Sequence, residues 1–382
     1  MKRLLFLMLI MIPFSVNAQP VLLKGRVVDA ASREGVAYTN IGIEGTYFGT
    51  ASDADGFFEL KIPEEYARGK LFFSAVGYRN VTLSLDGLLN RDFVRVPLSE
   101  QTYAIEGVDV SARSRVLFRI LRTASRRVPD NYHPGPFGLK WYYMEQLQEN
   151  DSVLSWREAV VNLYDQTGYS SPSVTDAFQN RGYRFAEARR NFEPRSFPSG
   201  QTGFDELLEM DLARLSNLIF NEELLNDYDL SLEGMAVYEN DSVWVISYKT
   251  SKPDLARTGD YFATRMDGKI YILKGSYALI RNECVIEASR NHPANRSLYT
   301  GSEAQRRVSY HYTSTYRKGG DRYLVNYLDC DKTWINPQGK LMSSRRRASV
   351  LDWQRQAEPI SRRDYFEDTP YVEAFWNSFK RP

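Results

Sequence analysis

The sequence has only three histidines and two cysteines, so metal binding and nucleophilic catalysis have few candidate residues. The three histidines are His133, His292 and His311. None has a second histidine or a glutamate at the spacing that places two zinc ligands on one helix face. The Gly-x-Ser-x-Gly turn of a serine nucleophile, a phosphate-binding loop and the dinucleotide-binding glycine pattern are also absent. We therefore predict that the protein is not an enzyme and has no catalytic residues, no bound metal and no cofactor.

Asp53, Asp55 and Gly56 resemble the start of a calcium-binding loop, with Glu64 at the position of the bidentate ligand. Residues 57–62, however, alternate between apolar and polar types as a strand does, and a strand would interrupt such a loop. Aspartate and glycine at this spacing also favour a tight turn with a positive φ. The turn is the interpretation that we prefer.

The two cysteines, Cys284 and Cys330, both lie in segments with the alternation of strands. In an oxidising compartment they could form a disulfide bond. Two separate, buried thiols are the other interpretation. The sequence leaves both alternatives open.

Residues 1–18 have the three parts of a cleavable export signal. Lys2 and Arg3 precede an apolar run at 4–14, which is shorter than the roughly 20 residues that a membrane-spanning helix needs. Small residues follow, so we expect a signal peptidase to cut after Ala18. No later segment is apolar enough to span a membrane. We therefore expect an exported protein of the periplasm or the periphery of the outer membrane, with no transmembrane segment after cleavage.

The composition suits a globular protein with two domains. The formal net charge is +1, and removal of Lys2 and Arg3 with the signal leaves −1. This balance gives no reason to expect a nucleic-acid partner. Apolar residues make up 43% of the chain and aromatic residues 13%, which is enough to build substantial cores.

Residues 19–111 have the pattern of a small all-β domain. Short alternating runs separated by turn residues lie at 23–28, 37–43, 57–62, 70–75, 81–85 and 93–98. The sequences at 25–29, 35–41, 49–58, 73–78 and 105–110 together resemble the carboxypeptidase regulatory-like domain. This resemblance implies a seven-stranded, transthyretin-like β-sandwich without catalytic residues. The family is widespread in exported proteins of Bacteroidetes-type bacteria.

Residues 112–136 are expected to form a connecting helix and linker. Val116, Leu117, Ile120 and Leu121 recur at helical spacing, and arginines occupy most of the remaining surface. The apolar side of such a helix packs on a domain, or the helix lies on anionic lipid. The first interpretation is the one that we prefer.

Residues 137–382 are expected to form a large antiparallel β domain with one helix at 204–225. The sequence Glu-Asn-Asp-Ser-Val occurs at 149–153 and 239–243, each time between two strand-like runs, and predicts two hairpins. A further turn is predicted at 266–269. The segments 130–132, 141–143, 158–161, 227–229, 268–272 and 277–280 resemble an uncharacterised module of Bacteroidetes envelope proteins. The order of strands and helix is similar to the curved half-barrel of LolA-like lipid and lipoprotein carriers.

Two surface features could carry a modification or a contact. Ser152 and Ser242 lie in the predicted hairpins, within Asp-Ser-Val sequences that resemble an O-glycosylation acceptor motif of Bacteroidetes. Plain turns are the alternative. The basic run at 345–347 is expected to be a solvated strand or turn, or a contact for anionic lipid head groups.

These observations favour an exported, non-enzymatic envelope protein with a binding or interaction role. It would carry an apolar ligand or lipid in the curved sheet, which is rich in aromatic residues: Trp141, Tyr142, Trp156, Tyr164, Trp244, Tyr248, Tyr271 and Trp334. The alternative is that the helix at 204–225 fills this concavity. The protein would then be a structural or accessory module that binds an envelope protein without a small ligand. An unrecognised hydrolase using Asp329 and Asp331 is the third hypothesis.

Overall fold

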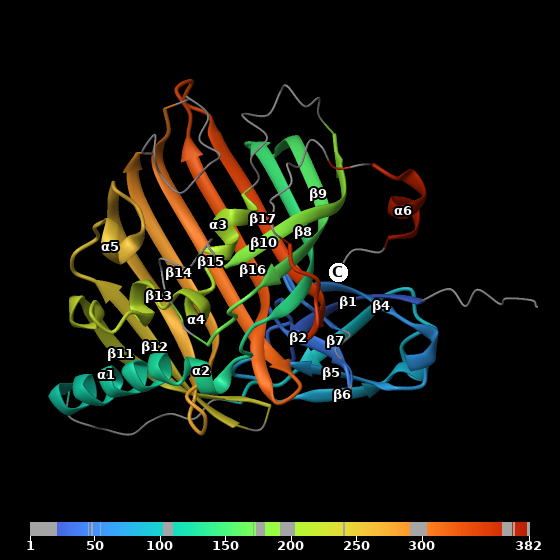
Figure 1. Cartoon of the computed structure of the whole chain (residues 1–382), viewed down its shortest axis with the longest axis horizontal. Coiled ribbons are helices and arrows are strands. Elements are labelled where there is room, and N and C mark those ends of the chain that lie inside the picture. The colour runs from blue at the N-terminus through green and yellow to red at the C-terminus, as the bar shows by residue number, and fades with distance from the viewer. Residues whose placement is uncertain are drawn as a thin grey trace, which may run out of the picture.

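The computed structural model shows a mainly β protein, with two small sheets and one ten-stranded antiparallel sheet. It describes residues 21–101, 110–170, 172, 180–191, 203–290, 304–360, 369 and 371–379, except positions 45, 47, 48, 54 and 240. The predicted export signal and its cleavage site after Ala18 lie outside these residues. The predicted fold class, a seven-stranded sandwich followed by a larger curved antiparallel sheet, is confirmed (Figure 1).

The front of the chain forms the sandwich. Its strands are β1 (Val21–Asp29), β2 (Asn40–Ile43), β3 (Gly49–Ala51), β4 (Phe57–Ile62), β5 (Lys70–Ser74), β6 (Val81–Ser84) and β7 (Val94–Leu98). They form one sheet in the order β4-β1-β7 and a second in the order β3-β2-β5-β6. Buried residues from both sheets, among them Val27, Ile41 and Phe73, pack together because alternate residues of each strand point inward.

The Asp53 sequence forms a turn that leads into β4. One carboxylate oxygen of Asp53 accepts hydrogen bonds from the backbone N–H groups of Asp55, at 3.0 Å, and Phe57, at 2.8 Å. Gly56 has a φ of +83°, and a side chain there would collide with the Val27 carbonyl oxygen. The turn that we preferred to a calcium loop is confirmed.

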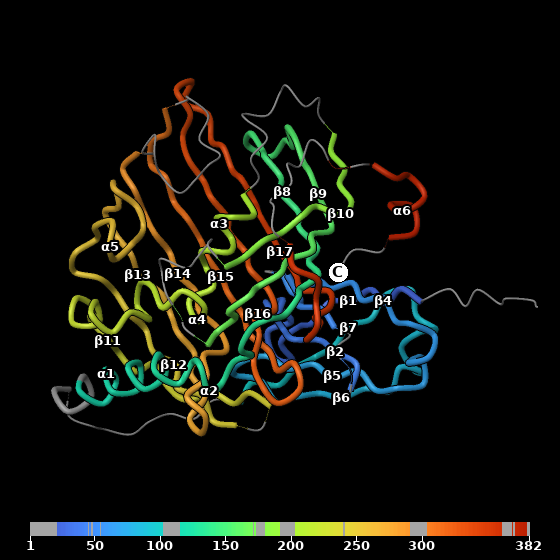
Figure 2. The backbone as a smooth tube through the Cα atoms, in the orientation of Figure 1, coloured from blue at the N-terminus to red at the C-terminus, as the bar shows by residue number. Residues whose placement is uncertain are grey.

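The large sheet has the strand order β10-β9-β8-β17-β16-β15-β14-β13-β12-β11. Its strands are β8 (Phe137–Glu149), β9 (Ser152–Asp165), β10 (Arg181–Arg190), β11 (Tyr228–Tyr238), β12 (Asp241–Thr250), β13 (Ala263–Leu273), β14 (Leu279–Arg290), β15 (Arg306–Gly319), β16 (Arg322–Ile335) and β17 (Leu341–Gln354). The backbone trace in Figure 2 shows how β8 to β10 curve round at one end. Both predicted hairpins are present, as β8–β9 and β11–β12.

The turn predicted at 266–269 is wrong, because β13 runs through it without a break. Gly268 has another reason to be a glycine. A side chain there would collide with the ring of Tyr248 and with the carbonyl oxygen of Glu283 on the neighbouring strand. Glycine thus permits close packing inside a strand rather than a reversal of the chain.

The helix predicted at 204–225 is broken into short pieces. They are α3 (Phe204–Leu208), α4 (Leu212–Leu215) and two 3₁₀ turns, Leu218–Phe220 and Leu225–Asp227. Asp211 caps α4 by accepting a hydrogen bond from the Arg214 N–H at 3.2 Å, and Ser216 and Leu218 adopt left-handed φ values of 50°. A cap in mid-helix and two left-handed residues end a helix, so the leucine spacing alone is misleading. We call residues 204–227 the inner segment.

Two further helices precede the large sheet. They are α1 (Val110–Arg126) and α2 (Val128–Asn131). Leu117, Ile120 and Leu121 of α1 lie in the core of the large domain, whereas Val116 is 41% exposed. The apolar side of the helix therefore packs on a domain, mainly against β11. Two short helices, α5 (Leu255–Thr258) and α6 (Glu373–Ser378), and two 3₁₀ turns of the sandwich, Glu64–Tyr66 and Leu85–Gly87, complete the described structure. None of its helices combines the length and the apolar character needed to cross a membrane.

The inner segment and the sandwich lie on opposite faces of the large sheet (Figure 1). We call the face that carries the inner segment the inner face, and the other the outer face. The contact between sandwich and outer face includes hydrogen bonds as well as the packing of the Tyr38 ring on that of Tyr327, with 5.5 Å between centroids. The Tyr38 hydroxyl donates a hydrogen bond to Asp329 at 3.2 Å, and the Asn40 amide donates one to the Tyr238 hydroxyl at 3.3 Å.

Asp329 should make the stability of this contact depend on pH. Burial raises its pKa to about 6, although Arg347 acts in the opposite direction. Because this pKa lies above that of the unfolded chain, near 4, the stabilisation is complete below about pH 4 and is lost as the pH rises through about 6. Urea unfolding at pH values from 4 to 7.5 should show this decline for the native chain but not for Asp329→Asn. A parallel decline in both proteins would contradict the assignment.

Of the two alternatives that the sequence left open for Cys284 and Cys330, the structure has the second: both are buried free thiols, and no disulfide joins them. Cys284 on β14 is aligned with Tyr312 on β15, and Tyr312 is aligned with Cys330 on β16. The cysteines are thus two strands apart, which corresponds to roughly 9–10 Å between their Cα atoms. A disulfide bond requires less than about 7 Å.

Candidate functional site

The inner face of the large sheet is filled by the chain's own side chains. The inner segment contributes Phe204, Leu207, Leu212 and Ile219, all buried in the same core as the strands. The ring of Phe204 meets that of Trp141 edge to face, with 6.0 Å between centroids. The alternative in which this segment fills the concavity is therefore the one that the structure supports.

The aromatic residues that suggested an apolar concavity do not share one face. Trp141 and Tyr248 are almost completely buried, whereas Trp156 and Trp244 are only partly buried. Trp141 and Tyr142 are consecutive in β8, so their side chains point to opposite faces of the sheet. Because side chains alternate along each strand, these aromatic residues are divided between the inner and the outer face of the sheet.

A buried ion network ties α3 to the middle of the sheet. Arg346 of β17 donates to Glu145 of β8 at 2.8 Å and also pairs with Glu206 of α3. Glu145 accepts a second bond from Arg157 of β9 at 2.7 Å, and Glu206 accepts one from the Tyr312 hydroxyl at 3.1 Å. Each of these four charged side chains is at most 1% exposed. Burial raises the pKa of Glu145, but Arg157 and Arg346 outweigh it and hold the value at about 2.

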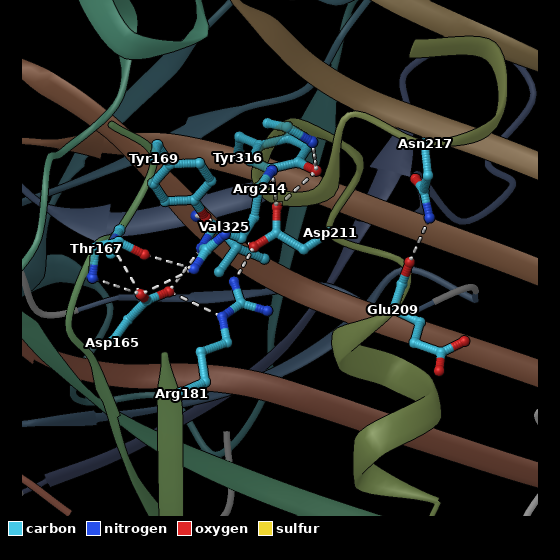
Figure 3. Close-up of polar contacts among 12 residues, drawn as sticks. Asp165, Thr167, Tyr169, Arg181, Glu209, Asp211, Arg214, Asn217, Tyr316 and Val325 are labelled. Atoms are coloured by element: carbon cyan, nitrogen blue, oxygen red, sulfur yellow. Dashed lines mark hydrogen bonds and ion pairs between the residues drawn. The ribbon is translucent and has the colours of Figure 1, made fainter. Parts of the chain in front are cut away.

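A second buried network ties α4 to the end of the sheet, where β9 and β10 meet (Figure 3). Asp165 accepts hydrogen bonds from Arg181, at 2.8 Å, and Arg214, at 2.9 Å. Asp211, the residue that caps α4, accepts from Arg181 at 2.9 Å and from the hydroxyls of Tyr169, at 2.9 Å, and Tyr316, at 3.1 Å. Two carboxylates and two guanidiniums thus balance in charge while fully buried.

These networks hold the inner segment against the sheet. Their groups are paired with each other, and a charge that is buried and paired is costly to separate. Among the described residues, no group of three or more His, Cys, Asp or Glu side chains is placed to hold a metal ion. The inner face is therefore a closed structural core.

The outer face carries an open cleft of about 600 Å³ over β11 to β15, bounded by Tyr38 of the sandwich. We call it the polar cleft. Its charged lining consists of Lys249, Arg265, Lys269, Arg281, Asp229, Asp267 and Glu283. Arg265 pairs with Asp267 at 2.6 Å, and Arg281 pairs with Glu283. Within the part of the chain that the structure describes, Lys249 and Lys269 form no ion pair, so the cleft has an excess of positive charge.

The other predicted site residues are dispersed. Ser152 is exposed at the start of β9 and Ser242 is partly exposed near the start of β12, so both lie beside hairpin turns and O-glycosylation stays a prediction. Asp331 pairs with Arg345 at 2.9 Å on the surface, whereas Asp329 is buried under the sandwich. His311 lines the polar cleft, His133 is buried against Trp353, and His292 lies outside the described residues.

The expectation that residues 345–347 are all solvated is wrong. Arg345 is exposed, but Arg346 is fully buried in the first ion network, and Arg347 lies under the sandwich with its side chain 15% exposed. Adjacent strand residues point to opposite faces, so a run of three cations in a strand must place one of them inward. The burial of Glu145 and Arg157 could have been inferred from the sequence in the same way. Each occupies a position in its strand where the alternation would place an inward-pointing, apolar residue.

Comparisons with known proteins support the resemblance that the sequence of the front domain suggested. The family model described as the CarboxypepD_reg-like domain matches residues 23–110. A search of curated proteins finds no match. Among solved structures, a LolA superfamily protein from Nitrosomonas europaea is similar over 63% of this chain and 94% of its own, with 9% identity and a TM-score of 0.26.

Proposed function

We propose that the protein is an exported, non-enzymatic component of the cell envelope that binds a protein partner and carries no small apolar ligand. The observation that supports this most strongly is the inner face, which is filled and held closed by two buried ion networks. An apolar ligand could enter only if the inner segment left the sheet and separated these charges. Export is inferred from residues 1–18, whose pattern is that of a signal peptide.

The polar cleft is the surface that fits a partner. It is open and lies where the two domains meet, so one partner can contact both. Its unpaired lysines, Lys249 and Lys269, favour an acidic segment of that partner. The sandwich, which carries no catalytic residues in the family that it matches, supplies one wall of this surface through Tyr38.

Charge reversal in the polar cleft tests the proposal. Lys249→Glu with Lys269→Glu should weaken recovery of a specific partner from host envelope extracts by about tenfold or more, because attraction becomes repulsion. Recovery is measured by crosslinking and quantitative mass spectrometry. Lys70→Glu with Lys140→Glu, at exposed positions outside the cleft, is the matched control. Equal recovery with both double variants would place the partner surface elsewhere.

The absence of a small ligand is tested separately. Native mass spectrometry of the protein purified from its own host should give the mass of the bare chain. A lipid that stays bound while the inner segment remains protected from hydrogen exchange would contradict the proposal.

A further inference from the structure

A second cleft, of about 350 Å³, lies where the two domains meet. It is lined on one side by residues of β1 and β4 of the sandwich, and on the other by residues of β8 and β17 on the large sheet. It shares no lining residue with the polar cleft. Phe57 and Phe93 come from the sandwich, and Tyr142 and Met144 come from β8. We call it the aromatic cleft. Because both domains build it, its shape depends on their fixed contact.

Two aromatic rings in this cleft are unusually exposed. Phe57 is 44% exposed and Phe93 is 46% exposed, and their ring centroids lie 6.4 Å apart. The Arg26 guanidinium, 4.8 Å from the centroid of Phe57, holds that ring in position. Adjacent exposed phenylalanines cost solubility unless something covers them, so such a patch indicates a binding surface.

The polar side of the cleft has hydrogen-bonding capacity to spare. Arg347 lies between two carboxylates, but its Nη1 is 3.6 Å from Asp53 and its Nε is 3.7 Å from Asp329, which is too far for direct hydrogen bonds. Within the described residues, Nε and Nη2 of Arg347 are buried and have no hydrogen-bond partner, so Nη1 is the atom of this guanidinium that a ligand in the cleft would meet. Lys24 and Glu59, on the opposite rim, pair with each other at 2.7 Å.

The positions of Arg347 and the two carboxylates limit which chemical groups of a ligand can bind between them. A hydroxyl group can accept from Arg347 and donate to Asp53 at the same time, and thus bridge a gap of this size. A carboxylate cannot donate and would bring a further negative charge beside Asp53 and Asp329. An ammonium group cannot accept from Arg347. The ligand group that satisfies both sides is a neutral one that both accepts and donates, and a hydroxyl does this with a single atom.

We propose that the aromatic cleft binds an uncharged carbohydrate chain. A sugar ring has an apolar C–H face, which would lie on Phe57 and Phe93, and a rim of hydroxyls, which would reach Arg347, Asp53 and the Lys24–Glu59 pair. The cleft has the combination typical of small-ligand sites, an aromatic lining with a few well-placed polar groups. The polar cleft is a separate surface, so each can be occupied without the other.

The full chain is tested against cellohexaose, maltohexaose, chitohexaose and an array of neutral and acidic glycans, with calorimetry for each hit. We expect a neutral glycan to bind, and Phe57→Ala with Phe93→Ala to weaken it by about tenfold or more. Both residues are exposed, so the variant should keep its melting temperature. Arg347→Lys, which retains the charge but loses the planar donor array, should also weaken binding. Leu154→Ala with Leu341→Ala is the control, since these residues are similarly exposed outside the cleft.

Three results would overturn the proposal. The first is that no neutral glycan binds the native chain. The second is that the phenylalanine variant binds as tightly as the control. The third is that uncharged hexapeptides, offered in the same assay, bind in place of sugars and depend on the same two phenylalanines, which would assign the cleft to a peptide.

Discussion

Replacement of Arg346 by methionine should lower the free energy of unfolding by about 3–5 kcal/mol, the cost typical of removing one partner from a buried ion network. Arg346 is the link between Glu145 of β8 and Glu206 of α3. Glu145 would keep Arg157, but the buried Glu206 would lose the guanidinium with which it forms an ion pair. Methionine fills a similar volume, so the lost charge rather than a cavity would cause the effect. Urea unfolding followed by tyrosine and tryptophan fluorescence measures it.

The adjacent residue provides the control. Arg345 points to the opposite face of β17 and pairs with Asp331 at the surface, where its side chain is 45% exposed. Arg345→Met should therefore cost less than about 1 kcal/mol. Equal losses in the two variants would show that Arg346 does not hold a buried network.

Acid should reveal the same network. The pKa of Glu145 is about 2 in the folded protein, below its value in the unfolded chain. Its stabilising contribution is therefore present above about pH 4.5 and is lost as the pH falls toward 2. In Arg346→Met the carboxylate has lost one of its two cations, so this variant should unfold at a higher pH than the native chain.

The fold could be predicted from the sequence wherever one face of a strand is buried and the other is exposed to solvent. Alternation located every sandwich strand except the three-residue β3 and most strands of the large sheet, and the Asn-Asp pairs located two hairpins. Strand β10 was missed because its arginines and glutamate interrupt the apolar pattern. Those charges are needed there, since Arg181 binds Asp165 and Asp211 in the second network.

The site could be predicted less well, because the decisive interactions join residues far apart in the sequence. Arg346 and Glu145 meet across the pair β17–β8, and no local pattern gives that neighbour relation. The sequence could not decide between a disulfide and two free thiols for the same reason, since β15 lies between the two cysteines. The turn predicted at Gly268 failed because a glycine can serve close packing as well as a reversal of the chain.

Replacement of Asp165 by asparagine should have the other large effect. Asp165 accepts from Arg181 and Arg214 and also from the backbone N–H of Gly168 at 2.8 Å. Asparagine has nearly the same shape but no charge, so the buried Arg181 guanidinium would keep only Asp211 and the Arg214 guanidinium would lose its carboxylate partner. We expect a loss of about 3–5 kcal/mol. Glu149→Gln, which removes the charge of an exposed pair with Lys340, should cost less than about 1 kcal/mol.

The Asp165 variant also tests whether the network holds the inner segment on the sheet. Hydrogen exchange should become faster in residues 204–227 before it does so in the sandwich, because Arg214 ties α4 to Asp165. Uniformly faster exchange would mean that the network stabilises the whole chain and does not hold this segment in particular. Burial raises the pKa of Asp165, but Arg181 and Arg214 outweigh it and lower the value, so its contribution is lost as the pH falls below about 4. The native chain should therefore lose stability in that range more steeply than Asp165→Asn, which has no carboxylate there to protonate.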